Sequence, residues 1–131
     1  ADVIVWQFPL FWYAKPSLLQ RWEEEVFTHG FSHGTNGKAL QGKKLILSVT
    51  TGAPAEFYAR EGRPNGGLED VLMPATQATV SLTGMTLVDP AVITYGVSYA
   101  FRNDPEQAKE LERKADDHAA RLVALLRDAA K

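Results

Sequence analysis

Residues 2–13, DVIVWQFPLFWY, decide the fold of this chain. The first half is a mostly apolar run rich in β-branched and aromatic residues, which predicts a buried strand over Asp2–Phe8. The second half, Pro9 to Tyr13, is an aromatic turn anchored by a proline. Because ligands of open parallel sheets bind beyond the carboxyl ends of the strands, this turn has two interpretations. It holds a flat ligand, or it packs as part of an aromatic core.

Strands and helices alternate along the rest of the chain. This alternation predicts an α/β, doubly wound parallel sheet in a single domain over residues 1–131. The expected elements are a helix over Pro16–Phe27 with Leu18, Leu19, Trp22, Val26 and Phe27 facing inward, a strand over Lys43–Val49, a turn over Thr50–Pro54, a loop over Ala55–Gly67, a helix over Leu68–Thr83 bent near Pro74 and closed by Gly84, a strand region over Met85–Tyr95 interrupted by Pro90, and a helix over Pro105–Ala130 with Asp104 as its N-cap and Leu111, Ala115, His118, Leu122 and Leu125 facing inward.

The composition of the chain argues against several classes of function. The chain has 131 residues, 45% of them hydrophobic and 23% charged, with a formal net charge of −2. This balance is typical of a globular domain and argues against nucleic acid as a partner. The absence of cysteine excludes disulfides and thiolate chemistry. No apolar run reaches the roughly 18 residues of a membrane helix, so we expect a cytoplasmic protein.

Three groups of polar residues have simpler interpretations than a functional site. His29 and His33 have the spacing of a helical metal pair, but Gly30 and Gly34 flank them, so we predict a loop and no metal site. Residues 23–25, three consecutive glutamates, are typical of the solvated face of a helix. His118 lies in a charged helix where the sequence names no partner for it.

The motifs at the ends of the first two strands resemble those of a known family. The segments VWQFPLFWY (5–13), PSLLQRW (16–22), EVF (25–27), GKALQGKK (37–44) and SVTTG (48–52) look like the flavodoxin-like NAD(P)H:quinone oxidoreductases. That family includes bacterial general-stress reductases and ancillary reductase subunits of glutathione-regulated potassium efflux systems. The resemblance implies a flavodoxin-like, three-layer α/β/α fold that lacks the family's first two strands and first helix in this chain.

The resemblance also implies a flavin site. The turn Pro9, Leu10, Phe11, Trp12 and Tyr13 would pack along the isoalloxazine ring, and the turn Thr50, Thr51, Gly52 and Ala53 would present backbone N–H groups to the ring's polar edge. Fixed dipoles at that edge stabilise the negative charge of a reduced flavin. Tyr58 matches a family tyrosine that hydrogen-bonds at the flavin edge and is the candidate catalytic residue. Alternatively, Tyr58 is an aromatic residue of a surface loop with no role in the site.

The chain departs from the family at three places. Pro64 stands where vertebrate members have a histidine, so no histidine is assigned a catalytic role. Ala53 replaces a glycine common in the motif. The elements that hold the flavin phosphate are missing from the front, where the chain starts with Ala1 rather than Met. We therefore expect a fragment that holds the ring half of the site and leaves an apolar strand edge at Val3–Trp6.

The resemblance predicts a flavin-dependent oxidoreductase. It would use FMN or FAD, take hydride from NADH or NADPH, and reduce a quinone or similar acceptor by a ping-pong sequence. Family members complete each pocket with a second subunit, so Phe11, Trp12, Tyr13 and the loop Phe27–Gly37 predict a homodimer. Two alternatives remain: a regulatory subunit that binds a membrane potassium-efflux system, and a truncated chain that binds no cofactor.

Overall fold

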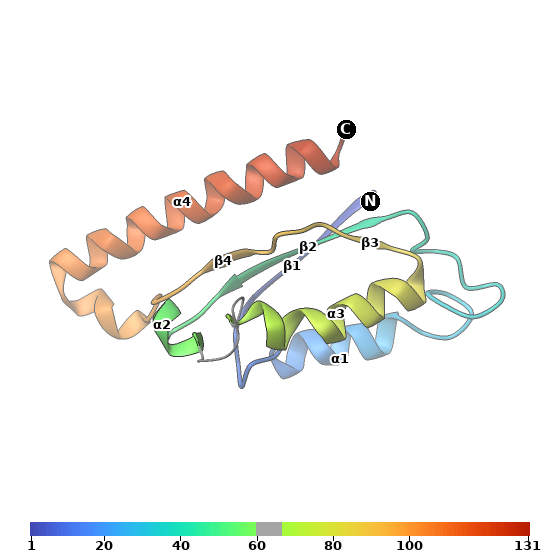
Figure 1. Ribbon diagram of the computed structural model, residues 1–131, viewed down its shortest axis with the longest axis horizontal. Coiled ribbons are helices and arrows are strands. Elements are labelled where there is room, and N and C mark those ends of the chain that lie inside the picture. Colours follow the sequence, from blue (N-terminus) through green and yellow to red (C-terminus); the bar gives the residue numbers. More distant parts are fainter. Residues whose placement is uncertain (60–66) are drawn as a thin grey trace.

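The elements follow the predicted alternation of strands and helices (Figure 1). The computed structural model describes residues 1–59 and 67–131. In chain order the elements are β1 (Val3–Pro9), α1 (Ser17–Val26), β2 (Lys44–Thr50), α2 (Ala55–Tyr58), α3 (Glu69–Thr83), β3 (Thr86–Leu87), β4 (Val92–Thr94), the 3-10 helix η1 (Tyr99–Asn103) and α4 (Pro105–Ala129).

The strands form one parallel sheet with β2 in the middle. β1 pairs with β2 over its whole length, so that Val3 lies opposite Lys44 and Pro9 opposite Thr50. β3 and β4 both pair with the other edge of β2. They are separated by the segment that contains Pro90, as the sequence predicted, because proline cannot donate to a ladder.

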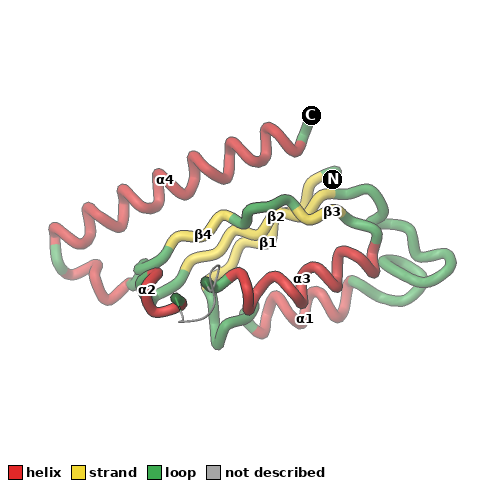
Figure 2. Tube along the Cα trace, in the orientation of Figure 1, coloured by secondary structure: helices red, strands yellow, loops and turns green. Residues whose placement is uncertain are grey.

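Helices cover both faces of the sheet, which confirms the three-layer α/β/α arrangement. α1 and α3 lie together on one face, and α4 lies on the other (Figures 1 and 2). The main core lies between the sheet and the α1/α3 layer. Its buried apolar residues include Trp6, Phe8, Leu45, Leu47, Val49, Leu68, Leu72 and Val80.

The predicted inward face of helix α1 is right in part: Leu19 and Phe27 pack against the core, but Leu18 and Trp22 do not face inward. Leu18 is 78% exposed and Trp22 is 42% exposed, whereas Glu23 is buried. The prediction that all three glutamates of residues 23–25 are solvated is therefore wrong for Glu23. Its carboxylate pairs with Lys15, whose ammonium lies 4.4 Å from the centre of the Trp6 ring. The apolar periodicity missed this arrangement because a paired charge can occupy a core position.

The other boundaries agree closely with the sequence. Gly84 ends α3 with a φ of 74°, and Asp104 caps α4 by accepting from the Glu106 and Gln107 N–H groups. α3 continues through Pro74 as a single helix. The expected loop after β2 is wrong in part, because residues 55–58 form the short helix α2.

The layer formed by α4 is incomplete. No residue of α4 is fully buried: Leu111, His118, Leu122 and Leu125 are half-buried, and Ala115 is exposed. Within the described residues β1 pairs only with β2, so its other edge is open, as predicted. None of the described helices is both long and apolar enough to cross a membrane.

Candidate functional site

The two predicted turns lie side by side at the carboxyl ends of β1 and β2. The parallel register places Pro9 opposite Thr50, and the Leu10 N–H donates to the Thr50 carbonyl at 2.8 Å. Ligand sites of open α/β sheets form at this edge. The structure thus brings together the two segments that the sequence singled out, although they are about 40 residues apart.

The first turn holds two bulky aromatic residues in a left-handed backbone conformation. Phe11 and Ala14 exchange N–H to carbonyl hydrogen bonds of 3.1 and 3.0 Å, and φ is 50° at Trp12 and 63° at Tyr13. Glycine, asparagine and aspartate are the usual residues in such a turn. Aromatic side chains there indicate strain, which tends to concentrate at ligand-binding sites. The Trp12 side chain is 94% exposed, so packing within this chain does not account for it.

The second turn keeps two backbone donors available. Thr51 is buried; its N–H donates to the Thr94 carbonyl at 3.0 Å, and its hydroxyl donates to the Ala53 carbonyl at 2.8 Å. Among the described residues, no backbone acceptor is found for the N–H groups of Gly52 and Ala53. These donors suit the electron-rich edge of a ligand that approaches from outside the sheet.

Tyr58 makes aromatic contacts with the first turn and with the end of β4. Its ring centre lies 6.2 Å from that of Tyr13, edge to face, and 5.7 Å from that of Tyr95. Burial raises the pKa of the Tyr95 phenol, and the nearby Glu69 and Tyr58 raise it further. Tyr95 is not among the residues that the sequence singled out for this site. It follows the last residue of β4, so the carboxyl-end rule that selected the other turns also applies to it.

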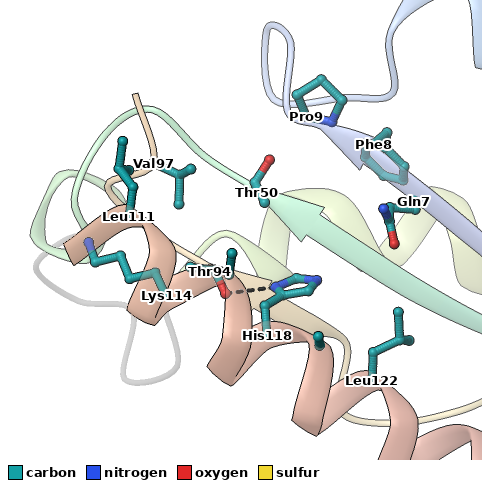
Figure 3. Close-up of a pocket in the computed structure, with 12 residues that line it drawn as sticks. Gln7, Phe8, Pro9, Thr50, Thr94, Val97, Leu111, Lys114, His118 and Leu122 are labelled. Carbon is teal, nitrogen blue, oxygen red and sulfur yellow. Dashed lines mark hydrogen bonds between the residues drawn. The ribbon is translucent and has the colours of Figure 1, made fainter. Parts of the chain in front are cut away.

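A cavity of about 430 Å³ opens between α4 and the sheet, next to these turns (Figure 3). Pro9 and Thr50 line it from the strand ends, and Lys114, His118 and Leu122 line it from α4. Its walls are mainly apolar side chains with a few polar groups, as in many small-molecule sites.

His118 has the partners that the sequence did not reveal. Its Nε2 lies 2.7 Å from the Ser48 hydroxyl. Its Nδ1 lies 2.7 Å from the Thr94 hydroxyl, a contact drawn in Figure 3. Arg121 donates to the same Thr94 hydroxyl. Burial lowers the pKa of His118, Arg121 lowers it further, and Asp117 opposes the change.

The described residues fit the ring half of a flavin better than its phosphate. The exposed aromatic turn offers a flat surface, and the Gly52 and Ala53 N–H groups offer donors for a polar ring edge. Helix N-termini that hold phosphate favour negative charge, yet α3 and α4 both begin with acidic residues. This set of groups suits a flat ring with an electron-rich edge.

The structure gives little support for a functional role of the other residues that the sequence singled out. The rings of His29 and His33 are 5.6 Å apart between centres. In the described part of the chain, no three histidine, aspartate or glutamate side chains group as metal ligands. Pro64, which replaces the family histidine, lies outside the described residues.

Residues 1–122 match the family model described as having a flavodoxin-like fold. The chain belongs to this family. General stress protein 14 of Bacillus subtilis is 46% identical over 103 residues, which are 79% of this chain and 58% of the relative. The glutathione-regulated potassium-efflux system ancillary protein KefF of an Enterobacter strain is 42% identical over 90 residues, 69% of this chain and 49% of the relative.

Solved structures show the same similarity. General stress protein 14 of Treponema denticola, in complex with FMN, superposes with a TM-score of 0.75 and 34% identity, covering 95% of this chain and 66% of that one. An NADPH-quinone reductase from P. pentosaceus superposes with a TM-score of 0.64 and 27% identity, covering 86% and 64%. This chain thus spans between about half and two thirds of the length of these relatives.

Proposed function

We propose that this chain forms the ring-binding part of a flavin-dependent NAD(P)H oxidoreductase that reduces quinones or related acceptors. The observation that carries the proposal is the pairing of two turns at one sheet edge, joined by the Leu10 to Thr50 hydrogen bond. The FMN bound to one relative and the NADPH-quinone reductase name of another support it.

In this proposal the chain binds and orients, while the flavin supplies the hydride chemistry. Pro9, Leu10, Phe11, Trp12 and Tyr13 contact the ring face. The N–H groups of Gly52 and Ala53 donate to the ring edge that becomes negative on reduction, and the buried Thr51 holds their backbone in place.

Tyr58 has a separate role in the proposed site. Its contact with Tyr13 holds its phenol near the aromatic turn. There the hydroxyl would donate a hydrogen bond to the flavin edge or to the acceptor. Phenol donors stabilise developing negative charge without a change in their own protonation.

The proposal is tested by stepwise reduction. The purified chain is reconstituted with FMN or FAD, and its absorbance is followed without oxygen. NADPH or NADH should bleach the flavin band, and a quinone should restore it, because a ping-pong enzyme completes each half-reaction alone. Replacing Tyr58 with Phe should lower the rate of reoxidation by roughly 10- to 100-fold. If the chain binds no flavin, the result supports the alternative that this chain has no cofactor.

The similarity to KefF favours a second candidate function, that of an ancillary subunit of a potassium efflux system. Potassium efflux from vesicles that contain such a system separates the two. An ancillary role predicts that the added chain stimulates efflux even when Tyr58→Phe slows reduction. A reductase without this role leaves efflux unchanged.

We also propose that the protein acts as a homodimer. Phe11 is 56% exposed, Trp12 94% and Phe57 60%, and these aromatic residues lie close to the proposed ring site. Exposed aromatic clusters of this kind mark interfaces. Sedimentation at micromolar concentration should give at least twice the mass of the chain, and a monomer with flavin bound and full activity would contradict the proposal.

A further inference from the structure

Lys114 connects α4 to the end of β4. Its ammonium donates to the Tyr95 carbonyl at 3.0 Å and to the Gly96 carbonyl at 3.2 Å. The side chain is half-buried and lines the cavity that Thr50 and Pro9 also line (Figure 3). Hydrogen bonds from a charged donor are stronger than those between neutral groups, so this contact is a substantial restraint on residues 95–96.

The segment that Lys114 holds is bonded in turn to the proposed flavin-edge turn. The Gly96 N–H donates to the Ala53 carbonyl at 2.9 Å, and the Val97 N–H donates to the Thr51 carbonyl at 2.7 Å. The Thr51 N–H completes the connection by donating to the Thr94 carbonyl at 3.0 Å. A change at Lys114 therefore reaches Thr51 and Ala53 through two successive layers of hydrogen bonds.

The backbone at Gly96 fits this arrangement closely. Gly96 has a φ of 67°, which favours glycine, and a Cβ atom there would lie 3.1 Å from the Lys114 ammonium nitrogen. The local chain path thus leaves room for the ammonium group against the two carbonyls.

We propose that Lys114 is a positioning residue for the flavin-edge turn, Thr50 to Ala53. It fixes residues 95–97, which fix the carbonyls of Thr51 and Ala53 and so the direction of the Gly52 and Ala53 N–H groups. Its positive charge on the cavity wall also favours the reduced, anionic form of a bound flavin. This inference rests on the proposed function for the identity of the ligand, while the restraint on the turn does not.

The test uses the 131-residue chain without and then with ligand. In Lys114→Met, amide hydrogen exchange at Gly96 and Val97 should become at least about tenfold faster, because the segment loses two charge-assisted bonds. Exchange at Leu72 and Val80 in the core helix should not change. With lumiflavin, the isolated isoalloxazine ring, Lys114→Met should bind at least about threefold more weakly and the midpoint potential should become more negative.

Two variants control for charge and folding. Lys114→Arg keeps the charge and donors and should restore slow exchange, whereas Lys109→Met removes an exposed lysine on another side of α4 and should match the parent chain. Lys114→Gln replaces the methionine variant if that variant does not fold. Unchanged exchange at Gly96 and Val97, or equal acceleration throughout the core, would overturn the inference. If the parent chain binds no lumiflavin but the exchange pattern holds, the proposed function fails and the restraint stands.

Discussion

At the residue scale, the left-handed backbone of Trp12 and Tyr13 carries much of the argument for a ligand site. A bulky residue gains nothing from this conformation by itself, and Trp12 is almost fully exposed. The strained backbone at this turn lowers the stability of the free chain. We infer that contacts with a ligand or a partner molecule offset this cost.

Replacing Trp12 with Asn tests this interpretation. Asn tolerates a positive φ, so the free energy of unfolding without ligand should rise by about 1 kcal/mol in urea titrations. Lumiflavin binding should weaken by roughly tenfold, because a stacked aromatic is lost. Tyr99→Asn is a matched control, since Tyr99 is 81% exposed and lies outside the two turns. A loss of stability in Trp12→Asn would show that the indole supports the fold.

His118 predicts a pH dependence of stability. Its pKa in the folded chain is lowered by burial, so the folded state disfavours the imidazolium. Stability from this residue is present above the unfolded pKa of about 6.5 and falls as the pH drops below that value, because the unfolded chain then binds the proton more readily. Urea midpoints measured from pH 8 to 5 should decrease, and His118→Gln should flatten the curve.

At the element scale, sequence patterns predicted the strands, the long helices, both turns and part of each buried helix face, but not the polar side chains that the structure buries. Strand order and turn position follow from local chemistry: a buried β-branched run, a proline, a glycine. The inward position of Glu23 depends on Lys15, which lies before the helix, and on Thr79 of α3, whose hydroxyl lies 3.5 Å from the carboxylate. Likewise, His118 has two partners, Ser48 and Thr94, which come from two separate strands. Such contacts between distant elements leave no periodic signal.

The Lys15 and Glu23 pair should behave as a buried ion pair. Their side chains are 16% and 12% exposed. Glu23→Ala leaves the Lys15 ammonium without its partner and should lower the free energy of unfolding by about 2 kcal/mol. The double variant Lys15→Met with Glu23→Leu should recover most of this loss, since burial already lowers the pKa of Lys15. Glu25→Gln, in an exposed pair with Arg21, should change stability by less than about 0.5 kcal/mol.

At the scale of the whole molecule, the sheet has an open edge and a half-covered face. β1 pairs on one side with β2 and on the other with no described strand, and the cavity beside it is walled by α4. Open edges recruit other strands. We therefore expect the chain, made as these 131 residues, to self-associate through β1.

A charge placed on β1 tests this expectation. Val5→Lys puts an ammonium group in the middle of the edge strand, where it should oppose pairing with another copy. In sedimentation, the Val5→Lys variant should form smaller species than the parent chain. Its association constant should be about tenfold lower. Leu82→Lys is the control, because Leu82 is 65% exposed and lies on α3. Equal effects of both variants would show that β1 is not the contact.

The central claim is that Pro9 to Tyr13 and Thr50 to Ala53 form one ring-binding site. A titration of the 15N-labelled chain with lumiflavin, monitored by backbone amide chemical shifts, tests this claim directly. Lumiflavin has no phosphate, so its binding does not need the phosphate-binding elements of the family. The account predicts saturable shifts concentrated at residues 10–13 and 50–53, with Gly52 and Ala53 among the largest and α1 unaffected. Shifts scattered over the surface, or none up to the solubility limit of the ligand, would contradict it.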